Sequence, residues 1–277
     1  MEKQLIFLDV DGTLCTSEGT ISTRTKEAIQ KAHENGHRFF ICTGRSKAEL
    51  TDEVLSLPID GIIGAGGGYC EVNDKVVFHK VLEKEELLDL VSYLKENKVE
   101  YYLESNDGLF ASTNLKNLLN EMTLRDNPGK GPEALKAITW FTDLLIEDES
   151  KIDYDHINKL SFVNQTIPFQ NIYDRYSNDF QVIPTTVSAF GKESGEVGVK
   201  NIHKQTAIEY VLHYMNEDKA HTMAFGDGHN DVEMFAAVRY GIAMENASDQ
   251  LLAVADEVTT SNNSDGIAVA LERHGLI

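Results

Sequence analysis

Apolar runs that end in short turns rich in Asp, Gly or Thr recur at both ends of this 277-residue chain. Leu5–Leu8, Phe39–Cys42 and Gly61–Ile63 lie in the first quarter, and His221–Phe225 and Gly241–Met244 lie near the end. Such runs are typical of strands buried on both faces of a parallel sheet. Helical patterns separate them, and strand–helix alternation with short links implies right-handed crossovers. The pattern predicts an α/β fold with a doubly wound parallel sheet.

Helices are expected between these strands. Ser22 can cap a helix that reaches about Asn35, where Gly36 stops it. A second helix is expected to run through about Leu57. A third, after Asn201 as its cap, should cover Ile202–Met215 and carry Lys204 on its inward face.

The pattern changes in the middle of the chain. Lys84–Asn97 predicts an amphipathic helix whose buried stripe is Leu87, Leu88, Val91 and Leu94. Short aromatic or alternating runs separated by polar loops follow. We therefore expect a core domain made of residues 1–82 and 190–277, interrupted by an inserted α+β domain at 83–189.

Charge and composition exclude several classes of partner. The net charge of −20 repels nucleic acids and anionic membrane surfaces, so neither is an expected partner. The three cysteines have no metal-ligand spacing and do not suggest a disulfide framework. The apolar run at Leu5–Leu8 is too short for a signal peptide, and we expect a cytoplasmic protein. The sequence does not indicate an oligomeric state.

Two aspartates follow the first expected strand, in the segment Asp9-Val10-Asp11-Gly12. Ligands of open α/β sheets bind at the carboxyl ends of the strands, and residues i and i+2 of an extended segment point the same way. One carboxylate could attack a substrate while the other exchanges a proton. Asp-Gly is also a common turn pair, but two carboxylates after a buried strand are costlier than a turn requires.

A second acidic turn follows His221–Phe225, where Asp227 and Asp231 flank Asn230. Carboxylate oxygens are the ligands that Mg²⁺ prefers. Together with the first acidic turn, they predict a magnesium site. Asn230 or Asp231 could also cap the next helix, and the two roles can coexist.

Three weaker signals concern phosphate. The hydroxyl of Thr43 and backbone N–H groups around Gly44 could hold a phosphate oxygen, although Thr-Gly is also an ordinary strand exit. Lys204 could neutralise a phosphoryl group, or it could be a solvated surface lysine. Arg45 could reach a substrate or pair with an acid.

These motifs, in this order, resemble the haloacid dehalogenase (HAD) superfamily. The resemblance rests on Asp9–Leu14, Thr43, Lys204 and Gly226–Asp231, and it covers roughly Leu5–Gly68 and Val197–Leu271. The long insertion before Lys204 resembles the Cof-like phosphatase subgroup, whose cap is of the C2 type. That subgroup often has an Asn-Gly pair where this chain has Gly66–Gly68, so its asparagine contacts to substrate do not carry over.

The resemblance implies a Mg²⁺-dependent phosphatase acting on a small phosphorylated metabolite, such as a sugar phosphate. Asp9 would form an aspartyl-phosphate, and Asp11 would be the general acid and base. Mg²⁺ would be held by Asp9, the backbone carbonyl of Asp11 and Asp227, with Asp231 in support. The phosphate would be bound by Thr43, Gly44, Lys204 and Asn230, and Arg45 is a further candidate substrate contact.

Other activities remain open. A phosphomutase or another phosphotransferase would share Asp9 and Asp11. A catalytically inactive protein that binds a phosphorylated ligand could keep the same fold. A halide-releasing dehalogenase fits less well, because it needs neither Asp11 nor the metal acids.

Overall fold

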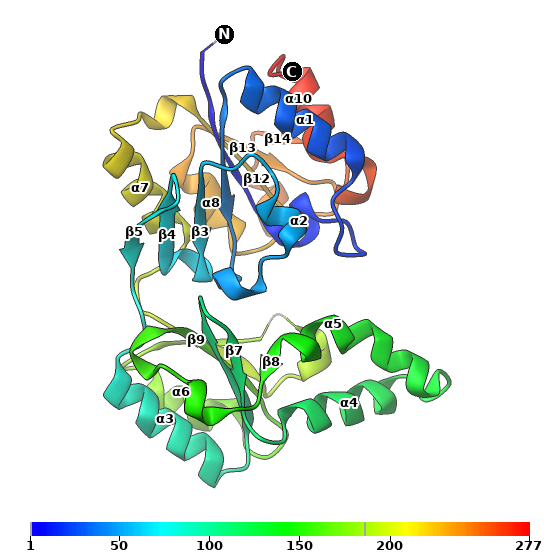
Figure 1. Ribbon diagram of the computed structural model, residues 1–277, viewed down its shortest axis with the longest axis vertical. Helices are drawn as coiled ribbons and strands as arrows, with labels where there is room; N and C mark the ends of the chain where they lie inside the picture. Colours follow the sequence, from blue (N-terminus) through cyan, green and yellow to red (C-terminus); the bar gives the residue numbers. More distant parts are fainter. Residues whose placement is uncertain (1, 186) are drawn as a thin grey trace. The chain divides into compact units, whose positions relative to one another are not determined.

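The computed structural model describes residues 2–185 and 187–277, which form two compact units (Figure 1). The first unit, the core, holds the chain up to Arg45, Leu50–His79 and Ile202–Ile277. The second, the inserted unit, holds Lys80–Asn201 and the short segment Ser46–Glu49. None of the described helices is long and apolar enough to cross a membrane.

The core unit contains a largely parallel sheet in the order β14-β13-β12-β1-β2-β3-β4-β5. Strands β14 to β3 of this order run parallel, whereas β4 and β5 form an antiparallel hairpin at the edge. Since β1 lies between β2 and β12, the two ends of the chain meet at the centre of the sheet. The strands are β1 (Leu5–Leu8), β2 (Arg38–Cys42), β3 (Gly61–Gly64), β4 (Tyr69–Val72), β5 (Lys75–His79), β12 (Thr222–Gly226), β13 (Tyr240–Ala243) and β14 (Glu257–Val258).

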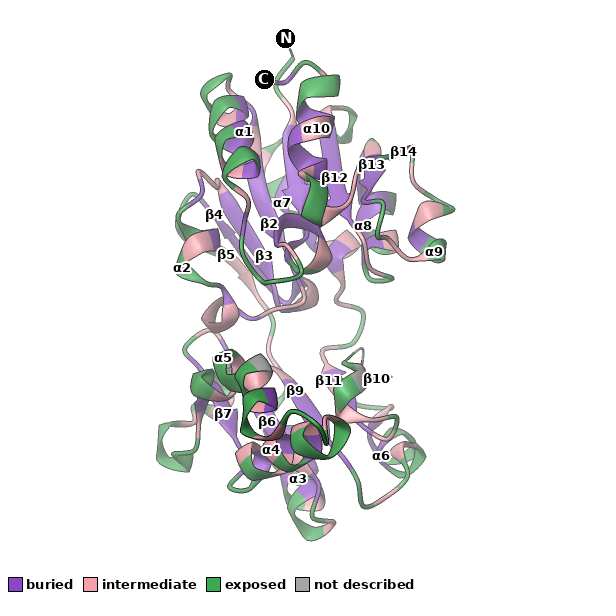
Figure 2. Ribbon diagram, turned by 90° about the vertical axis from the view of Figure 1, so that its right-hand side faces the viewer, coloured by how far each residue is buried: buried purple, intermediate pink, exposed green. Residues whose placement is uncertain are grey.

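Helices cover both faces of this sheet, which confirms the doubly wound α/β prediction. Alternate residues of β1 point to opposite faces, so that Ile6 and Leu8 pack on one side while Leu5 and Phe7 pack on the other. Figure 2 shows the strands buried and the outer faces of the helices exposed. One face packs on α1 (Thr23–Glu34), α2 (Asp52–Leu55) and α10 (Gly266–Arg273), and the other packs on α7 (Lys204–Met215), α8 (Asp231–Ala237) and α9 (Asp249–Leu252).

Helix α2 is shorter than expected. It starts after Thr51, whose hydroxyl accepts a hydrogen bond from the N–H of Val54, and it ends at Leu55 instead of about Leu57. Pro58 follows closely, and proline disfavours helical backbone in the residue before it. The expected first half of this helix is only a 3₁₀ turn at Lys47–Glu49.

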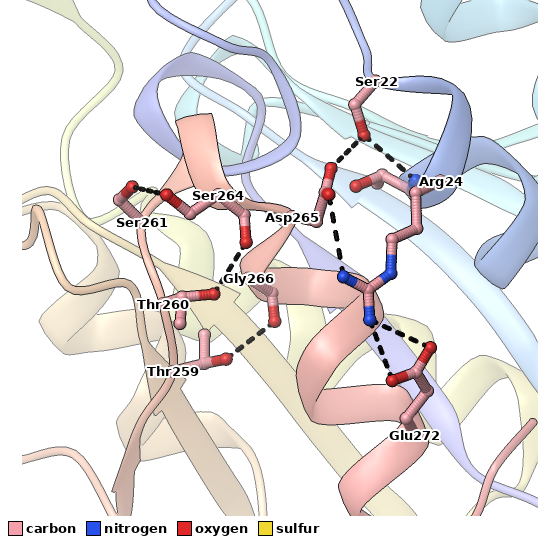
Figure 3. A network of polar contacts seen from close by, with 10 residues as sticks. Ser22, Arg24, Thr259, Thr260, Ser261, Ser264, Asp265, Gly266 and Glu272 are labelled. Atoms are coloured by element: carbon pink, nitrogen blue, oxygen red, sulfur yellow. Dashed lines mark hydrogen bonds and ion pairs between the residues drawn. The ribbon is translucent and has the colours of Figure 1, made fainter.

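Polar contacts join the start of α1 to both ends of α10 (Figure 3). Ser22 accepts a hydrogen bond from the N–H of Thr25, as a helix cap does, and donates one to Asp265. Arg24 pairs with Glu272 of α10. Residues near the two ends of the chain therefore pack together outside the sheet as well as within it.

The inserted unit has its own antiparallel sheet, with one parallel pair at an edge, in the order β10-β11-β9-β6-β7-β8. Helices α3 and α6 pack on one face, and α4 and α5 pack near the other. Its strands are β6 (Glu100–Ser105), β7 (Leu109–Ala111), β8 (Leu145–Ile146), β9 (Ile157–Val163), β10 (Gln181–Pro184) and β11 (Gly195–Gly198), and its helices are α3 (Lys84–Glu96), α4 (Leu115–Asp126), α5 (Lys136–Leu144) and α6 (Phe169–Tyr176).

Two details of this unit differ from expectation. In α3 the buried stripe includes Leu90, whereas Leu88 is 39% exposed. The insertion also extends to Asn201 instead of residue 189, because β11 pairs with both β9 and β10 and so belongs to the inserted sheet.

Candidate active site

The carboxyl ends of β1, β2 and β12 bring the candidate residues together. Asp9 follows β1, Thr43 follows β2 and Asp227 follows β12. Because β1 pairs in parallel with both other strands, these ends share one edge of the sheet. This is also the point where the strand order reverses, which is where open α/β sheets bind their ligands.

The turn after β1 is tight and depends on Gly12. Its φ is +78°, a left-handed conformation that glycine adopts at little cost. A Cβ atom at this position would lie 2.2 Å from Oδ2 of Asp227. The first acidic turn therefore passes directly against the second. Thr13 joins them, because its hydroxyl donates to Oδ1 of Asp227 over 2.8 Å.

Lys204 lies between two carboxylates. Its ammonium donates to Oδ1 of Asp9 and to Oδ1 of Asp231, both at 2.6 Å, and its side chain is only 2% exposed. Lys204 is the first residue of α7, and the residue that caps this helix is His203, which accepts a hydrogen bond from the N–H of Thr206. The expectation that Asn201 caps this helix was wrong.

Asp231 holds the second acidic turn in shape. Its Oδ2 accepts hydrogen bonds from the N–H groups of Asp227 and Gly228, at 3.0 and 2.9 Å. Its side chain is completely buried. Asp231 therefore lies between Lys204 and the backbone that carries Asp227, whereas Asn230 is exposed and its side chain does not cap α8.

Electrostatics at this site favour an added cation. Burial raises the pKa of Asp9 to about 8, and the nearby carboxylates of Asp231 and Asp227 add to that effect while Lys204 opposes it. Burial also raises the pKa of Asp227 to about 6. Burial disfavours the charge of Lys204, yet Asp9 and Asp231 raise its pKa above the ordinary range. The acids outnumber the single lysine, which leaves uncompensated negative charge in a buried place.

The donor set fits a hard divalent cation. Asp9, Asp227 and Asp231 each offer a carboxylate oxygen, and these oxygens lie within 4.8 Å of one another. Oxygen ligands of this kind suit Mg²⁺, which usually takes few protein ligands and keeps several waters. Part of this set is already engaged, because Asp231 bonds Lys204 and two backbone N–H groups. That arrangement favours Asp9 and Asp227 as direct ligands.

The turn after β2 supplies Thr43, Gly44 and Arg45. Thr43 is buried, and its hydroxyl accepts a hydrogen bond from the N–H of Arg45. The guanidinium of Arg45 donates to both carboxylate oxygens of Asp11, at 2.9 and 2.6 Å. Of the two roles open to Arg45, the structure thus shows the pairing with an acid.

Sequence reasoning missed two residues that support the site. Thr13 was not singled out, although it binds Asp227. Asn246 donates to the carbonyl of Gly12 at 2.8 Å and accepts from the N–H of Asn262, so it ties the acidic turn to the end of the chain. The sequence offers one signal for the contact between Thr13 and Asp227, which is that Thr13 directly follows the Asp-Gly pair of the first acidic turn. We find no such signal in the sequence around Asn246.

Comparison with known proteins agrees with this geometry. A model of the haloacid dehalogenase-like hydrolase family matches residues 6–271. The phosphatase YwpJ of Bacillus subtilis is 25% identical over 283 residues, which cover 96% of this chain and 97% of YwpJ. The 5-amino-6-(5-phospho-D-ribitylamino)uracil phosphatase YwtE of the same organism is 25% identical over 279 residues, which cover 97% of this chain and 96% of YwtE.

A solved structure shares the fold. The HAD-superfamily protein BT1666 from Bacteroides thetaiotaomicron superposes with a TM-score of 0.76 at 24% identity, over 99% of this chain and 96% of BT1666. The family match spans nearly the whole sequence, including both acidic turns and the insertion between them. This chain therefore belongs to the haloacid dehalogenase-like hydrolases.

Proposed function

We propose that this chain is a Mg²⁺-dependent phosphatase that hydrolyses small phosphate monoesters, such as sugar phosphates, through an aspartyl-phosphate on Asp9. The observation that carries the proposal is the buried contact of Lys204 with both Asp9 and Asp231. An ammonium fixed beside the nucleophile can offset the charge of a phosphoryl group. The names of YwpJ and YwtE support phosphate ester hydrolysis.

In the first half-reaction, Oδ2 of Asp9 bonds to phosphorus while the bond from phosphorus to the ester oxygen breaks. Oδ1 of Asp9 is held by Lys204, whereas Oδ2 receives no hydrogen bond from the described residues. Asp11 in its acid form gives its proton to the leaving oxygen, so that a neutral alcohol departs. Lys204, the hydroxyl of Thr43 and the N–H of Gly44 bind the non-bridging phosphate oxygens, and Asn230 orients its neighbours.

In the second half-reaction, a water oxygen bonds to phosphorus while the bond to Asp9 breaks. The Asp11 carboxylate takes the proton of that water and is ready for the next cycle as an acid. Inorganic phosphate leaves, and the Asp9 carboxylate is restored. Asp9, the carbonyl of Asp11 and Asp227 would hold Mg²⁺, with Asp231 in support, and the bound cation would lower the repulsion between carboxylate and phosphate.

The test is phosphate release from a panel of metabolite monophosphates, with water as the only acceptor and with or without Mg²⁺. We expect release only with Mg²⁺ and none from Asp9→Asn, which keeps the shape of the side chain but is a poor nucleophile. Asp249→Asn, an exposed change in α9, is the matched control and should keep full activity. Retained turnover in Asp9→Asn protein would refute the mechanism.

Two other results would redirect the assignment. Transfer of phosphate to a second sugar without release of free phosphate would identify a phosphotransferase. Binding of phosphorylated ligands without turnover of any of them would identify a binding protein on this fold.

A further inference from the structure

The loop between β13 and α9 is bonded to the second acidic turn through its backbone. The N–H of Met244, at the start of the loop, donates to the carbonyl of Gly226 at 3.0 Å. The N–H of Ser248, at its end, donates to the carbonyl of Asp227 at 2.9 Å. A hydrogen bond from the N–H of Ala247 to the carbonyl of Met244, at 2.9 Å, closes the loop into a tight turn. The loop is thus fixed against the turn that carries Asp227.

Asn246 lies in the middle of this loop and binds the first acidic turn. Its Nδ2 donates to the carbonyl of Gly12 at 2.8 Å, and its Oδ1 accepts from the N–H of Asn262 at 3.1 Å. The side chain is exposed, yet hydrogen bonds at both of its polar atoms restrict it to one orientation. Asn262 also donates to the carbonyl of Cys15 at 2.9 Å, directly after the same turn. Asn246 therefore connects the two acidic turns through its side chain, and all of these residues belong to the core unit.

We propose that Asn246 is a positioning residue for the Mg²⁺ site, because it helps to set the separation of the two acidic turns. This role rests on the proposed function, in which Asp9 and the carbonyl of Asp11 bind the metal from the first turn and Asp227 binds it from the second. A cation bound by both turns needs their oxygens at fixed separations. Mg²⁺ requires near-ideal octahedral geometry, whereas Ca²⁺ accepts irregular sets of oxygen ligands.

The hydrogen bond from Asn246 acts on the most adaptable residue of the first turn. Gly12 has a φ of 78° and a ψ of −1°, and glycine can leave this conformation at little cost. Its carbonyl is one residue from that of Asp11, the proposed backbone ligand, so fixing the first carbonyl also orients the second. The contact between Thr13 and Asp227 joins the same two turns and remains when Asn246 is replaced. We therefore expect a partial loss of metal affinity.

Metal binding in the absence of substrate tests this role. Mn²⁺ binding is followed by the loss of the electron paramagnetic resonance signal of the free ion, and displacement by Mg²⁺ or Ca²⁺ gives the dissociation constants of those ions. Asn246→Ala should raise the Mg²⁺ dissociation constant about 3- to 10-fold, the effect of one lost neutral hydrogen bond. The Ca²⁺ dissociation constant should change less than about twofold, because Ca²⁺ tolerates displaced ligands. At saturating Mg²⁺, phosphate release should keep most of the kcat of the unaltered protein.

Asn35→Ala is the matched control. Asn35 is also exposed, and its side-chain amide donates to the carbonyl of Leu276, likewise at 2.8 Å. It lies just before β2, whereas the acidic turns lie at the carboxyl ends of their strands. Asn35→Ala removes the same kind of hydrogen bond and should lower the melting temperature about as much as Asn246→Ala does. Its dissociation constants for Mg²⁺ and Ca²⁺ should equal those of the unaltered protein.

Three results would overturn the role of Asn246. These are an unchanged Mg²⁺ dissociation constant in Asn246→Ala, equal losses of Mg²⁺ and Ca²⁺ affinity in that variant, and a loss of Mg²⁺ affinity of the same size in Asn35→Ala. Failure of the unaltered protein to bind Mn²⁺ or Mg²⁺ would instead refute the metal site on which the proposal rests.

Discussion

Replacing Gly12 by alanine tests how closely the two acidic turns depend on each other. The change has two effects in the structure. A residue with a side chain is strained at φ +78°, by about 1–2 kcal/mol. The new Cβ would also lie 2.2 Å from Oδ2 of Asp227, so this carboxylate must move. Its movement breaks the hydrogen bond from Thr13, worth about 1.5–3 kcal/mol when one partner is charged.

Together these effects should lower the free energy of unfolding by about 2.5–5 kcal/mol. The displaced Asp227 should also raise the Mg²⁺ concentration for half-maximal activity roughly 10- to 100-fold, since about 1.4 kcal/mol corresponds to tenfold. Urea unfolding measures the first quantity, and a Mg²⁺ titration of phosphate release measures the second.

Gly19→Ala is the matched control. Gly19 has a φ of +77°, and a Cβ there would meet nothing within 4 Å. It should therefore lose only the backbone part, about 1–2 kcal/mol, and keep its Mg²⁺ dependence. If the two variants lose the same stability and respond alike to Mg²⁺, the close approach of Gly12 to Asp227 affects neither stability nor metal binding, and the reasoning is refuted.

Three further predictions concern single side chains. Asp227→Ala should raise the Mg²⁺ concentration for half-maximal activity at least about tenfold, as expected for a lost metal ligand, whereas Glu149→Ala removes only a surface pair with a lysine; equal Mg²⁺ titrations would count against the metal site. Lys204→Ala should lose at least about 2 kcal/mol of transition-state stabilisation in kcat/KM, and Lys200→Ala, whose ammonium contacts an exposed backbone carbonyl, should lose little; the reverse order would refute the assigned lysine. Burial lowers the pKa of His37, so below about pH 6.5 the unfolded chain binds a proton that the folded chain resists, and the free energy of unfolding should fall from pH 7 to pH 5. In His37→Gln, the free energy of unfolding measured in urea should change less between pH 7 and pH 5. An unchanged pH dependence would show that His37 is not its cause.

Much of the core could be predicted because parallel strands buried on both faces appear as continuous apolar runs. Leu5–Leu8 was predicted with the bounds that the structure has, and Ser22 caps α1 as expected. The acidic turns were located for the same reason, since each follows such a run. How Lys204 and Asp231 meet depends on long-range packing between α7 and α8, which no local pattern shows.

The errors also have physical reasons. Asn201 and His203 can both cap a helix, and the choice depends on backbone conformation: Asn201 adopts a left-handed φ of 58°, whereas His203 is extended. The membership of Ser46–Glu49 in the inserted unit is set by partners more than 50 residues away along the chain, such as Asn106 and Asn158. Periodicity within one segment carries no information about such partners.

The pairing of β1 with β12 has a consequence for how the protein is made. A ribosome that has just completed the inserted unit has already released β1, β2 and β3, but not β12, the strand that covers the other edge of β1. The backbone groups on that edge of β1 therefore stay unpaired in the nascent chain until β12 emerges in the last quarter of the sequence. The inserted unit, whose strands are all consecutive in sequence, can close its own sheet earlier. Synthesis thus favours a vectorial order in which the inserted unit matures first, and a chain truncated before residue 222 lacks the partner that its first strand requires.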